Sequence, residues 1–268
     1  MEHHLFPALG ERPIGSISRE DLLQALSPMN AAGKVVYVRK VRMWAGQVFD
    51  WAVEHGEAKV NPAKLIDPAK AFGRRRVQHF AALPAREVPE LLRRLDLEGD
   101  LQSVLACRLL ALTWVRTAEL RFARWSEFDG QRWEVDAERM KKKGRLPHIV
   151  PLPRQAVPIL EKLRARCRGS VYLLPAEHRI DRPISENAIL ALLYRLGYKG
   201  RMTGHGWRAI ASTWANEAGY NPDAIERQLA HAPDDETRAA YNRAQYLPER
   251  TAMLQAWADW LDSHAATG

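Results

Sequence analysis

The segment Thr203–Arg208 reads TGHGWR and places a histidine and an arginine three residues apart. Ile210 and Trp214 continue the apolar side of a helical pattern, which predicts a helix over about 205–218. On such a helix His205 and Arg208 share one face. A histidine and an arginine at this spacing are common by chance, so their meaning depends on their companions elsewhere in the chain.

A second arginine stands about ninety positions upstream, in the segment Arg116–Leu120, which reads RTAEL. Glu119 lies three residues after Arg116 and can pair with its guanidinium group and orient it. Guanidinium groups stay charged and bond two phosphate oxygens at once. Fixed cations aimed at these oxygens stabilise a phosphoryl transition state more than its ground state. Arg116 and Arg208 are therefore predicted to hold a phosphate.

Tyr241 follows His231 by ten residues and is the predicted nucleophile. A free phenol has a pKa near ~10, so it needs a base or a strongly cationic site to attack. His205 is the expected base, and His231 adds a further polar group to the site. The alternative is that Tyr241 is an ordinary packed helix residue. The order of two arginines, two histidines and one tyrosine favours attack on a phosphodiester.

Two β-rich pieces, at 133–136 and 148–152, flank the basic run RMKKKGR at 139–145. The glycine in that run predicts a hairpin turn. A departing 5′-alkoxide needs a proton, and a lysine at a hairpin tip is a suitable general acid. Lys141 is the first candidate, and Lys142 and Lys143 remain alternatives. The lysines that do not fill this role would contact backbone phosphates.

The bulk composition favours a nucleic-acid partner. The chain has 268 residues and a net charge of +8, with a pI of about 9.6. Its two cysteines form no C-x-x-C pair, and it has neither a magnesium-type carboxylate cluster nor a phosphate-binding glycine-rich loop. We therefore expect no metal and no cofactor. The chain lacks a signal-peptide pattern and an apolar run of ~20 residues, so a cytoplasmic protein is expected.

The first segment, residues 1–66, is predicted to be helical. Ser18 and Asp21 form a plausible N-terminal cap, and apolar residues at three- and four-residue steps predict a long helix over about 34–55. The basic residues of that helix are candidate DNA contacts, and they are Arg39, Lys40 and Arg42. Their contacts with DNA would be mainly to phosphates.

Residues 67–78 are predicted to be a linker, because they combine breakers and charge with little apolar content. Their arginines, Arg74, Arg75 and Arg76, either lie in a solvated loop or cross a phosphate backbone, and both alternatives stay open. A second domain is predicted over 79–268, and it is mostly helical with a small hairpin.

These blocks resemble the tyrosine recombinases, most closely the integrases of phages and genomic islands. Residues 112–129 resemble their first signature box, 137–152 their lysine-bearing hairpin, 203–214 their second box and 239–243 their nucleophile segment. By that resemblance the active-site residues are Arg116, Lys141, His205, Arg208, His231 and Tyr241. More weakly, residues 1–66 resemble the family's helical core-binding domain.

The resemblance implies a fold that is mostly α with a small β-hairpin or sheet: a core-binding domain over 1–66 and a recombinase catalytic domain over 79–268. It implies cleavage and rejoining of DNA through a 3′-phosphotyrosine, to integrate or excise a prophage or genomic island. The arm-binding domain that often precedes these domains is expected to be absent. The alternatives are a dimer-resolving recombinase and a truncated, non-catalytic DNA-binding remnant.

The partners implied are double-stranded DNA with a core-type attachment site and further copies of the chain in a homo-tetramer on DNA. The resemblance also allows accessory DNA-bending or directionality factors. No membrane partner is expected, and the cytoplasmic protein would associate with the nucleoid when it binds DNA.

Overall fold

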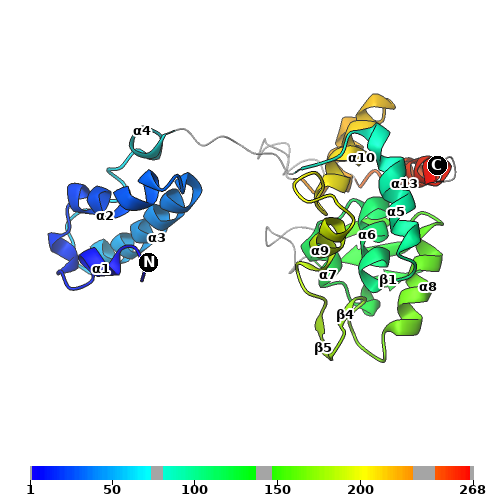
Figure 1. Ribbon diagram of the computed structural model, residues 1–268, viewed down its shortest axis with the longest axis horizontal. Coiled ribbons are helices and arrows are strands. Elements are labelled where there is room, and N and C mark those ends of the chain that lie inside the picture. Colours follow the sequence, from blue (N-terminus) through cyan, green and yellow to red (C-terminus); the bar gives the residue numbers. More distant parts are fainter. Residues whose placement is uncertain (1, 74–80, 137–146, 232–244, 266–268) are drawn as a thin grey trace. The chain divides into compact units, whose positions relative to one another are not determined.

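The computed structural model describes residues 2–73, 81–136, 147–231 and 245–265. The chain divides into two compact units, Met1–His79 and Phe80–Gly268 (Figure 1). Each unit has its own hydrophobic core. Among the candidate residues, those at 74–76, 141–143 and 241 lie outside the described residues.

Within the described residues, the secondary-structure elements of the first unit are all helices. Apolar residues of α2 and α3 recur at helical spacing and pack together, with Leu22, Leu26, Val38 and Phe49 buried between them. The long helix expected over 34–55 is confirmed as α3. The elements of this unit are α1 (Phe6–Leu9), a 3₁₀ turn (Ile14–Ser16), α2 (Arg19–Ala31), α3 (Val35–Glu54) and α4 (Pro68–Phe72).

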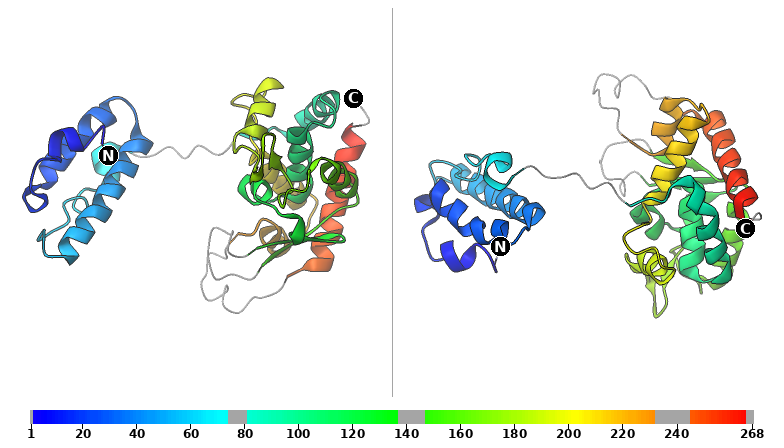
Figure 2. Two further views of the ribbon diagram at one scale, coloured as in Figure 1. Left: turned by 90° about the horizontal axis from the view of Figure 1, so that it is seen from below. Right: turned by 45° about the horizontal axis from the view of Figure 1, so that its top comes forward.

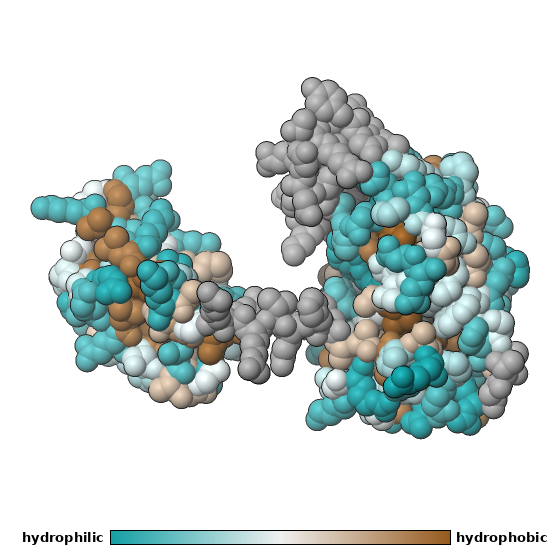
Figure 3. Space-filling view, turned by 90° about the horizontal axis from the view of Figure 1, so that it is seen from above, coloured by the Kyte–Doolittle hydropathy of each residue, from teal (hydrophilic) through white to brown (hydrophobic). Residues whose placement is uncertain are grey.

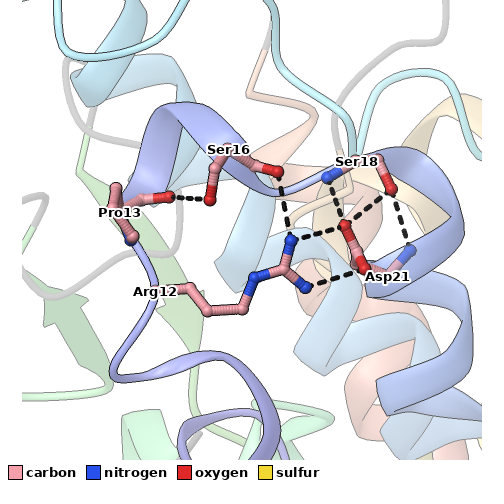
Figure 4. A network of polar contacts seen from close by, with 5 residues as sticks. All are labelled: Arg12, Pro13, Ser16, Ser18 and Asp21. Carbon is pink, nitrogen blue, oxygen red and sulfur yellow. Dashed lines mark hydrogen bonds and ion pairs between the residues drawn. The ribbon is translucent and has the colours of Figure 1, made fainter.

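Helix α2 begins at a reciprocal cap, as predicted. The Asp21 amide donates to Ser18 Oγ at 3.1 Å, and the Ser18 amide donates to Asp21 Oδ2 at 2.8 Å. Arg12 adds a two-pronged bond to the Asp21 carboxylate and a bond to the Ser16 carbonyl (Figure 4). Arg12 and Ser18 together hold the pKa of Asp21 well below its ordinary value. The cap therefore fixes both the start of α2 and the loop before it.

Helix α3 carries apolar side chains outside its buried stripe as well. Val36, Tyr37, Met43 and Trp51 are all exposed, and the Trp51 ring stacks on His55 with 4.1 Å between ring centroids. Figure 3 shows that apolar residues reach the surface of this unit. The core of the unit thus uses only part of the apolar residues on α3.

The second unit is built around α6, most of which is buried and which contacts α8, α9, α10 and α13. A helix with apolar residues on most of its faces must lie inside a fold, which explains its central place. The helices of the unit are α5 (Val88–Leu97), α6 (Gln102–Thr113), α7 (Thr117–Arg121), α8 (Ala156–Arg166), α9 (Ala188–Arg195), α10 (Gly206–Glu217), α11 (Pro222–Gln228) and α13 (Leu247–Ala265), with 3₁₀ turns at Ala85–Glu87 and Trp125–Glu127.

Two small antiparallel sheets accompany these helices. In the first, with strand order β1-β2-β3, Trp133 pairs with Val150 and Val135 with His148. The two β-rich pieces expected from the sequence are β2 and β3, so that prediction is confirmed. The strands are β1 (Phe128–Asp129), β2 (Arg132–Val135), β3 (His148–Pro151), β4 (Pro175–Ala176) and β5 (Arg179–Pro183).

The long helix α13 packs on its own unit, against α5, α6, α10, α11 and β3 (Figure 2). Met253, Trp257 and Leu261 are buried, and the Trp257 indole N–H donates to the Ala111 carbonyl at 2.8 Å. Trp260 is only partly buried and stacks on Trp257 with 5.0 Å between centroids. Much of the apolar stripe on this helix therefore completes the core of the second unit. None of the helices within the described residues is long and apolar enough to cross a membrane.

His148, the first residue of β3, is fully buried, and its two ring nitrogens have no hydrogen-bond partner among the described residues. Burial lowers its pKa well below the ordinary value of 6.5, and the guanidinium groups of Arg250, Arg227, Arg208 and Arg116 lower it further. The ring is therefore neutral in the folded protein.

This buried ring predicts loss of stability in mild acid. The unfolded state binds a proton as the pH falls through 6.5 and the folded state does not, so stability falls in that direction. One such histidine contributes about 1 kcal/mol between pH 7.5 and 5.5. In urea unfolding at these two pH values, His148→Leu should lose less stability than the parent by about that amount. Equal losses in both proteins would contradict the burial of a neutral ring.

Candidate active site

Arg116 lies in the tight connection between α6 and α7. Helix α6 ends at Thr113, Trp114 adopts a left-handed backbone with φ of 58°, and α7 begins directly after Arg116. The Arg116 Nη1 donates to Glu119 Oε1 at 2.7 Å, and its backbone amide donates to Glu119 Oε2 at 2.7 Å. Its Nη2 donates to the Ala230 carbonyl at 3.1 Å. The predicted pairing with Glu119 is therefore present.

Arg208 is the third residue of α10 and is 8% exposed. Its Nη1 donates to the Trp114 carbonyl, and its Nη2 donates to the Leu229 carbonyl at 2.6 Å. Burial, and then the neighbouring charge of Arg116, lower the pKa of Arg208 to about 10. The guanidinium group therefore remains charged at neutral pH, and two carbonyls from separate segments of the chain hold it in place.

His231 contacts the same guanidinium. Its Nε2 lies 3.3 Å from Arg208 Nη2, and its Nδ1 lies 2.7 Å from Glu226 Oε2. Because a guanidinium group only donates, Nε2 accepts in this contact. In the neutral ring the proton then lies on Nδ1 and is donated to Glu226. Ala230, the residue before His231, has a left-handed backbone with φ of 49°.

His205 is the residue before α10 and is half-buried. Burial lowers the pKa of its ring, and the charges of Arg208 and Arg116 lower it further. At neutral pH the ring is therefore neutral and able to accept a proton. His205 stands three residues before Arg208, and its neighbour Gly204 packs against Thr117, the residue after Arg116.

The two glycines around His205 permit close packing. A Cβ at Gly206 would lie 2.8 Å from the Ala81 carbonyl oxygen, and a Cβ at Gly204 would lie 2.8 Å from Thr117 Oγ1. Thr203 Oγ1 accepts from the Gly206 amide at 3.2 Å. The TGHGWR segment is thus wedged between the start of the second unit and the start of α7, and only glycine fits at these two positions.

The structure therefore gathers four predicted residues, and these are Arg116, His205, Arg208 and His231. Lys141 and Tyr241 lie outside the described residues, so their place in the site stays a prediction. Among the described residues no group of three or more His, Cys, Asp or Glu side chains could hold a metal ion. The arrangement suits a dianionic or phosphodiester ligand, because two fixed cations converge beside two histidines.

Sequence reasoning missed several residues that belong to this region. Glu226 orients His231, and the charges of the site arginines lower the pKa of His148. Arg250 and Gln228 are both buried, and the Arg250 guanidinium donates two hydrogen bonds to Gln228 Oε1. Glu226 could have been noticed from its place five residues before His231, although that signal is weak. Arg250 looks in the sequence like any other surface arginine.

The candidate DNA contacts of the first unit differ in exposure. Arg39 is half-buried and its Nη2 donates to the Pro68 carbonyl at 2.8 Å and to the Gly73 carbonyl. Lys40 is exposed and lies over the Trp44 ring at 5.0 Å from its centroid. Arg42 is half-buried. Arg39 thus joins α3 to α4, a structural role that the sequence did not predict, and DNA binding by these residues stays a prediction.

Comparison with known proteins identifies the family. The model of the phage integrase family matches residues 81–247, and that of the phage integrase central domain matches residues 1–69. The chain belongs to the phage integrase family. The fold agrees: the chain superposes on a lambda integrase dimer bound to a COC′ core site with a TM-score of 0.66, at 17% identity over 91% of this chain and 69% of that one.

Two curated integrases are similar over nearly the whole chain. Prophage integrase IntZ of Escherichia coli K12 is 40% identical over 98% of this chain and 64% of its own length. The integrase of Enterobacteria phage P4 is 35% identical over 98% of this chain and 63% of its own length. The chain thus spans just under two thirds of these relatives. A Tn1549 transposon integrase in complex with circular intermediate DNA also matches, with a TM-score of 0.62 at 18% identity, over 91% of this chain and 87% of that one.

The electrostatics of the site predict a measurable pKa. The pKa of His205 should lie below 6.5 and should rise in Arg208→Met, because that change removes the guanidinium with the larger effect on the ring. Ring NMR resonances, assigned with His205→Gln, measure it over a pH titration. Arg201→Met is the matched control, because Arg201 is an exposed arginine that pairs with Glu87 instead. A His205 pKa above 6.5 in the parent protein would refute the proposed proximity.

Proposed function

We propose that the chain is a site-specific DNA recombinase that cleaves and rejoins DNA through a 3′-phosphotyrosine, integrating and excising a prophage or genomic island. The observation that carries the proposal is the pair of anchored guanidinium groups, Arg116 and Arg208, beside His205 and His231. The integrases that resemble the chain over 98% of its length support the same activity.

In the proposed reaction the two arginines bind the non-bridging oxygens of the scissile phosphate. Carbonyl oxygens and Glu119 already hold both groups, so little reorganisation accompanies the growth of negative charge in the transition state. His231 accepts from Arg208 and donates to Glu226, and it keeps that guanidinium oriented. Preorganised donors of this kind account for much of the rate enhancement in phosphoryl transfer.

Tyr241 supplies the nucleophilic oxygen in this proposal. His205 takes the phenolic proton as the oxygen–phosphorus bond forms, and its lowered pKa keeps it in the neutral form that accepts protons. The bond to the 5′-oxygen breaks at the same time. Lys141 is proposed to protonate that oxygen, and Lys142 and Lys143 remain alternatives. Rejoining reverses these steps, so the bond energy is kept in the phosphotyrosine link.

The proposed partner is double-stranded DNA carrying a core-type attachment site. Lambda integrase structures are described as a dimer bound to a core site and a tetramer bound to a Holliday junction. We propose a homo-tetramer on DNA for this chain as well, with a core-binding role for residues 1–66, a linker over 67–78 and a catalytic role for residues 79–268. Accessory DNA-bending or directionality factors, a cytoplasmic location and association with the nucleoid through DNA belong to the same proposal.

The central test is a covalent adduct. The chain should become linked to a nicked suicide duplex carrying the junction sequence of its own element, with EDTA present, as a band that resists SDS. Tyr241→Phe should abolish the adduct, because no other group supplies the attacking oxygen. DNA affinity should change by no more than about threefold, since the lost hydroxyl is worth about one hydrogen bond.

The exposed Tyr194 provides the control, and Tyr194→Phe should leave adduct formation unchanged. An adduct that survives Tyr241→Phe would disprove the assignment of the nucleophile. Specific binding of the junction duplex without any adduct would favour a non-catalytic DNA-binding protein, and efficient resolution of dimer junctions without integration would favour a dimer-resolving recombinase.

DNA binding should depend steeply on salt. Each phosphate neutralised by lysine or arginine releases counterions, so log affinity should fall against log salt with a slope of about −0.9 per phosphate contact. Fluorescence anisotropy at several salt concentrations measures the slope. A nearly flat response would contradict binding through the many basic residues that give the chain its charge of +8.

A further inference from the structure

Arg250 is a fully buried arginine on α13 that the proposed reaction does not use. Burying a charged group costs several kcal/mol unless hydrogen bonds compensate it. Burial and the nearby charge of Arg227 lower its pKa to about 9, so it is charged at neutral pH. Hydrogen bonds within the protein must therefore offset the cost of burying this charge.

The guanidinium of Arg250 bonds three separate segments. Its Nε and Nη2 donate to Gln228 Oε1 at 2.9 and 2.7 Å. Its Nη2 also donates to the Ile149 carbonyl at 2.6 Å, and its Nη1 donates to the Gln245 carbonyl at 3.1 Å. These acceptors lie on α11, on β3 and in the residues before α13. A planar fork with five donors suits such a junction, whereas a lysine has one nitrogen.

Gln228 extends the junction to a fourth segment. Its Nε2 donates to the carbonyl of Thr113, the last residue of α6, at 2.8 Å. Both polar ends of this buried amide are therefore used. We refer to Arg250, Gln228 and the three backbone carbonyls of Thr113, Ile149 and Gln245 as the Arg250 junction.

Every segment of the Arg250 junction leads to a proposed site residue. Thr113 lies three residues before Arg116, and Gln228 lies three residues before His231. Gln245 lies four residues after Tyr241, and Ile149 lies on the strand that follows the lysines at 141–143. The junction thus joins segments that are far apart in the sequence. It does so at positions only a few residues from Arg116, His231 and Tyr241 in the sequence.

The residues at 245–246 are held from two further directions. Arg227 donates to the Gln245 side-chain oxygen through Nε at 3.1 Å and Nη2 at 2.6 Å. Tyr246 has a left-handed backbone with φ of 49°, and its carbonyl accepts from the Arg250 amide at 2.8 Å. The first described residues after Tyr241 are therefore fixed to the same group that supports the arginine-bearing segments.

We propose that Arg250 is a positioning residue, which fixes the segment following Tyr241 relative to Arg116 and His231 so that the nucleophile and the phosphate clamp keep one geometry. This inference rests on the proposed function. It predicts that loss of the junction slows formation of the phosphotyrosine on bound DNA while binding of DNA is preserved. Small errors in the placement of reacting groups are sufficient for losses of about 100-fold.

The experiment compares Arg250→Met, Arg250→Lys and Trp257→Phe in the full chain. Trp257→Phe removes the hydrogen bond from α13 to the Ala111 carbonyl and leaves the Arg250 junction intact, so it controls for destabilisation of the same helix. Single-turnover adduct formation on the nicked junction duplex gives a rate constant, an amplitude and the DNA concentration at half saturation. Thermal unfolding of each variant gives its stability.

Arg250→Met should lower the rate constant at saturating DNA by about 10- to 100-fold, with a half-saturating concentration within about twofold of the parent. Arg250→Lys should recover part of the rate, because it keeps the charge and some donors. Trp257→Phe should lower the unfolding temperature and leave the rate constant unchanged. A normal rate constant with reduced amplitude in Arg250→Met would mean that the residue serves stability alone, and would overturn the proposal.

Hydrogen exchange separates this inference from the proposed function. Exchange in peptides covering residues 245–250 should quicken in Arg250→Met more than in Trp257→Phe, whether or not the protein cleaves DNA. If the parent protein forms no adduct, the proposed function fails, and this measurement still decides whether the junction holds the segment. Equal exchange in the two variants would overturn the positioning role.

Discussion

The site depends on the way that backbone carbonyls fix two guanidinium groups that would otherwise repel each other. Arg208 bonds the carbonyls of Trp114 and Leu229, and Arg116 bonds that of Ala230 and the Glu119 carboxylate. Trp114 and Ala230 both adopt left-handed backbones, which cost about 1–2 kcal/mol each for residues other than glycine. The strain lies where the chain turns next to these carbonyls. Favourable contacts in the rest of the fold must offset its free-energy cost.

The sequence predicted those features that rest on local periodicity and end signals. The apolar spacing along α3 and the reciprocal cap of Ser18 and Asp21 both appear as expected. The pairing of Arg116 with Glu119 is local too, since it joins residues three apart, and it was predicted for that reason. Spacing of three or four residues in the sequence is enough to foresee contacts of this range.

Features that depend on long-range burial were not foreseen. The bonds of Arg39 to carbonyls near α4 were not predicted, and Arg250 was not singled out at all although it is wholly buried. In a chain with 40 lysines and arginines, a buried arginine looks like a surface one until the tertiary acceptors are known. His148 is similar: a histidine at a strand start gives no hint that it is fully buried or that four guanidinium charges lower its pKa.

The place of Arg250 on α13 has a consequence for how the protein is made. Two of its acceptors, on Ile149 and Gln228, belong to segments that leave the ribosome before α13 does, and so does Thr113, which accepts from Gln228. Until α13 emerges, Gln228 lacks its cationic partner and the second unit lacks Trp257 from its core. A nascent chain therefore contains Arg116 and His231 before it contains the arginine that joins their segments.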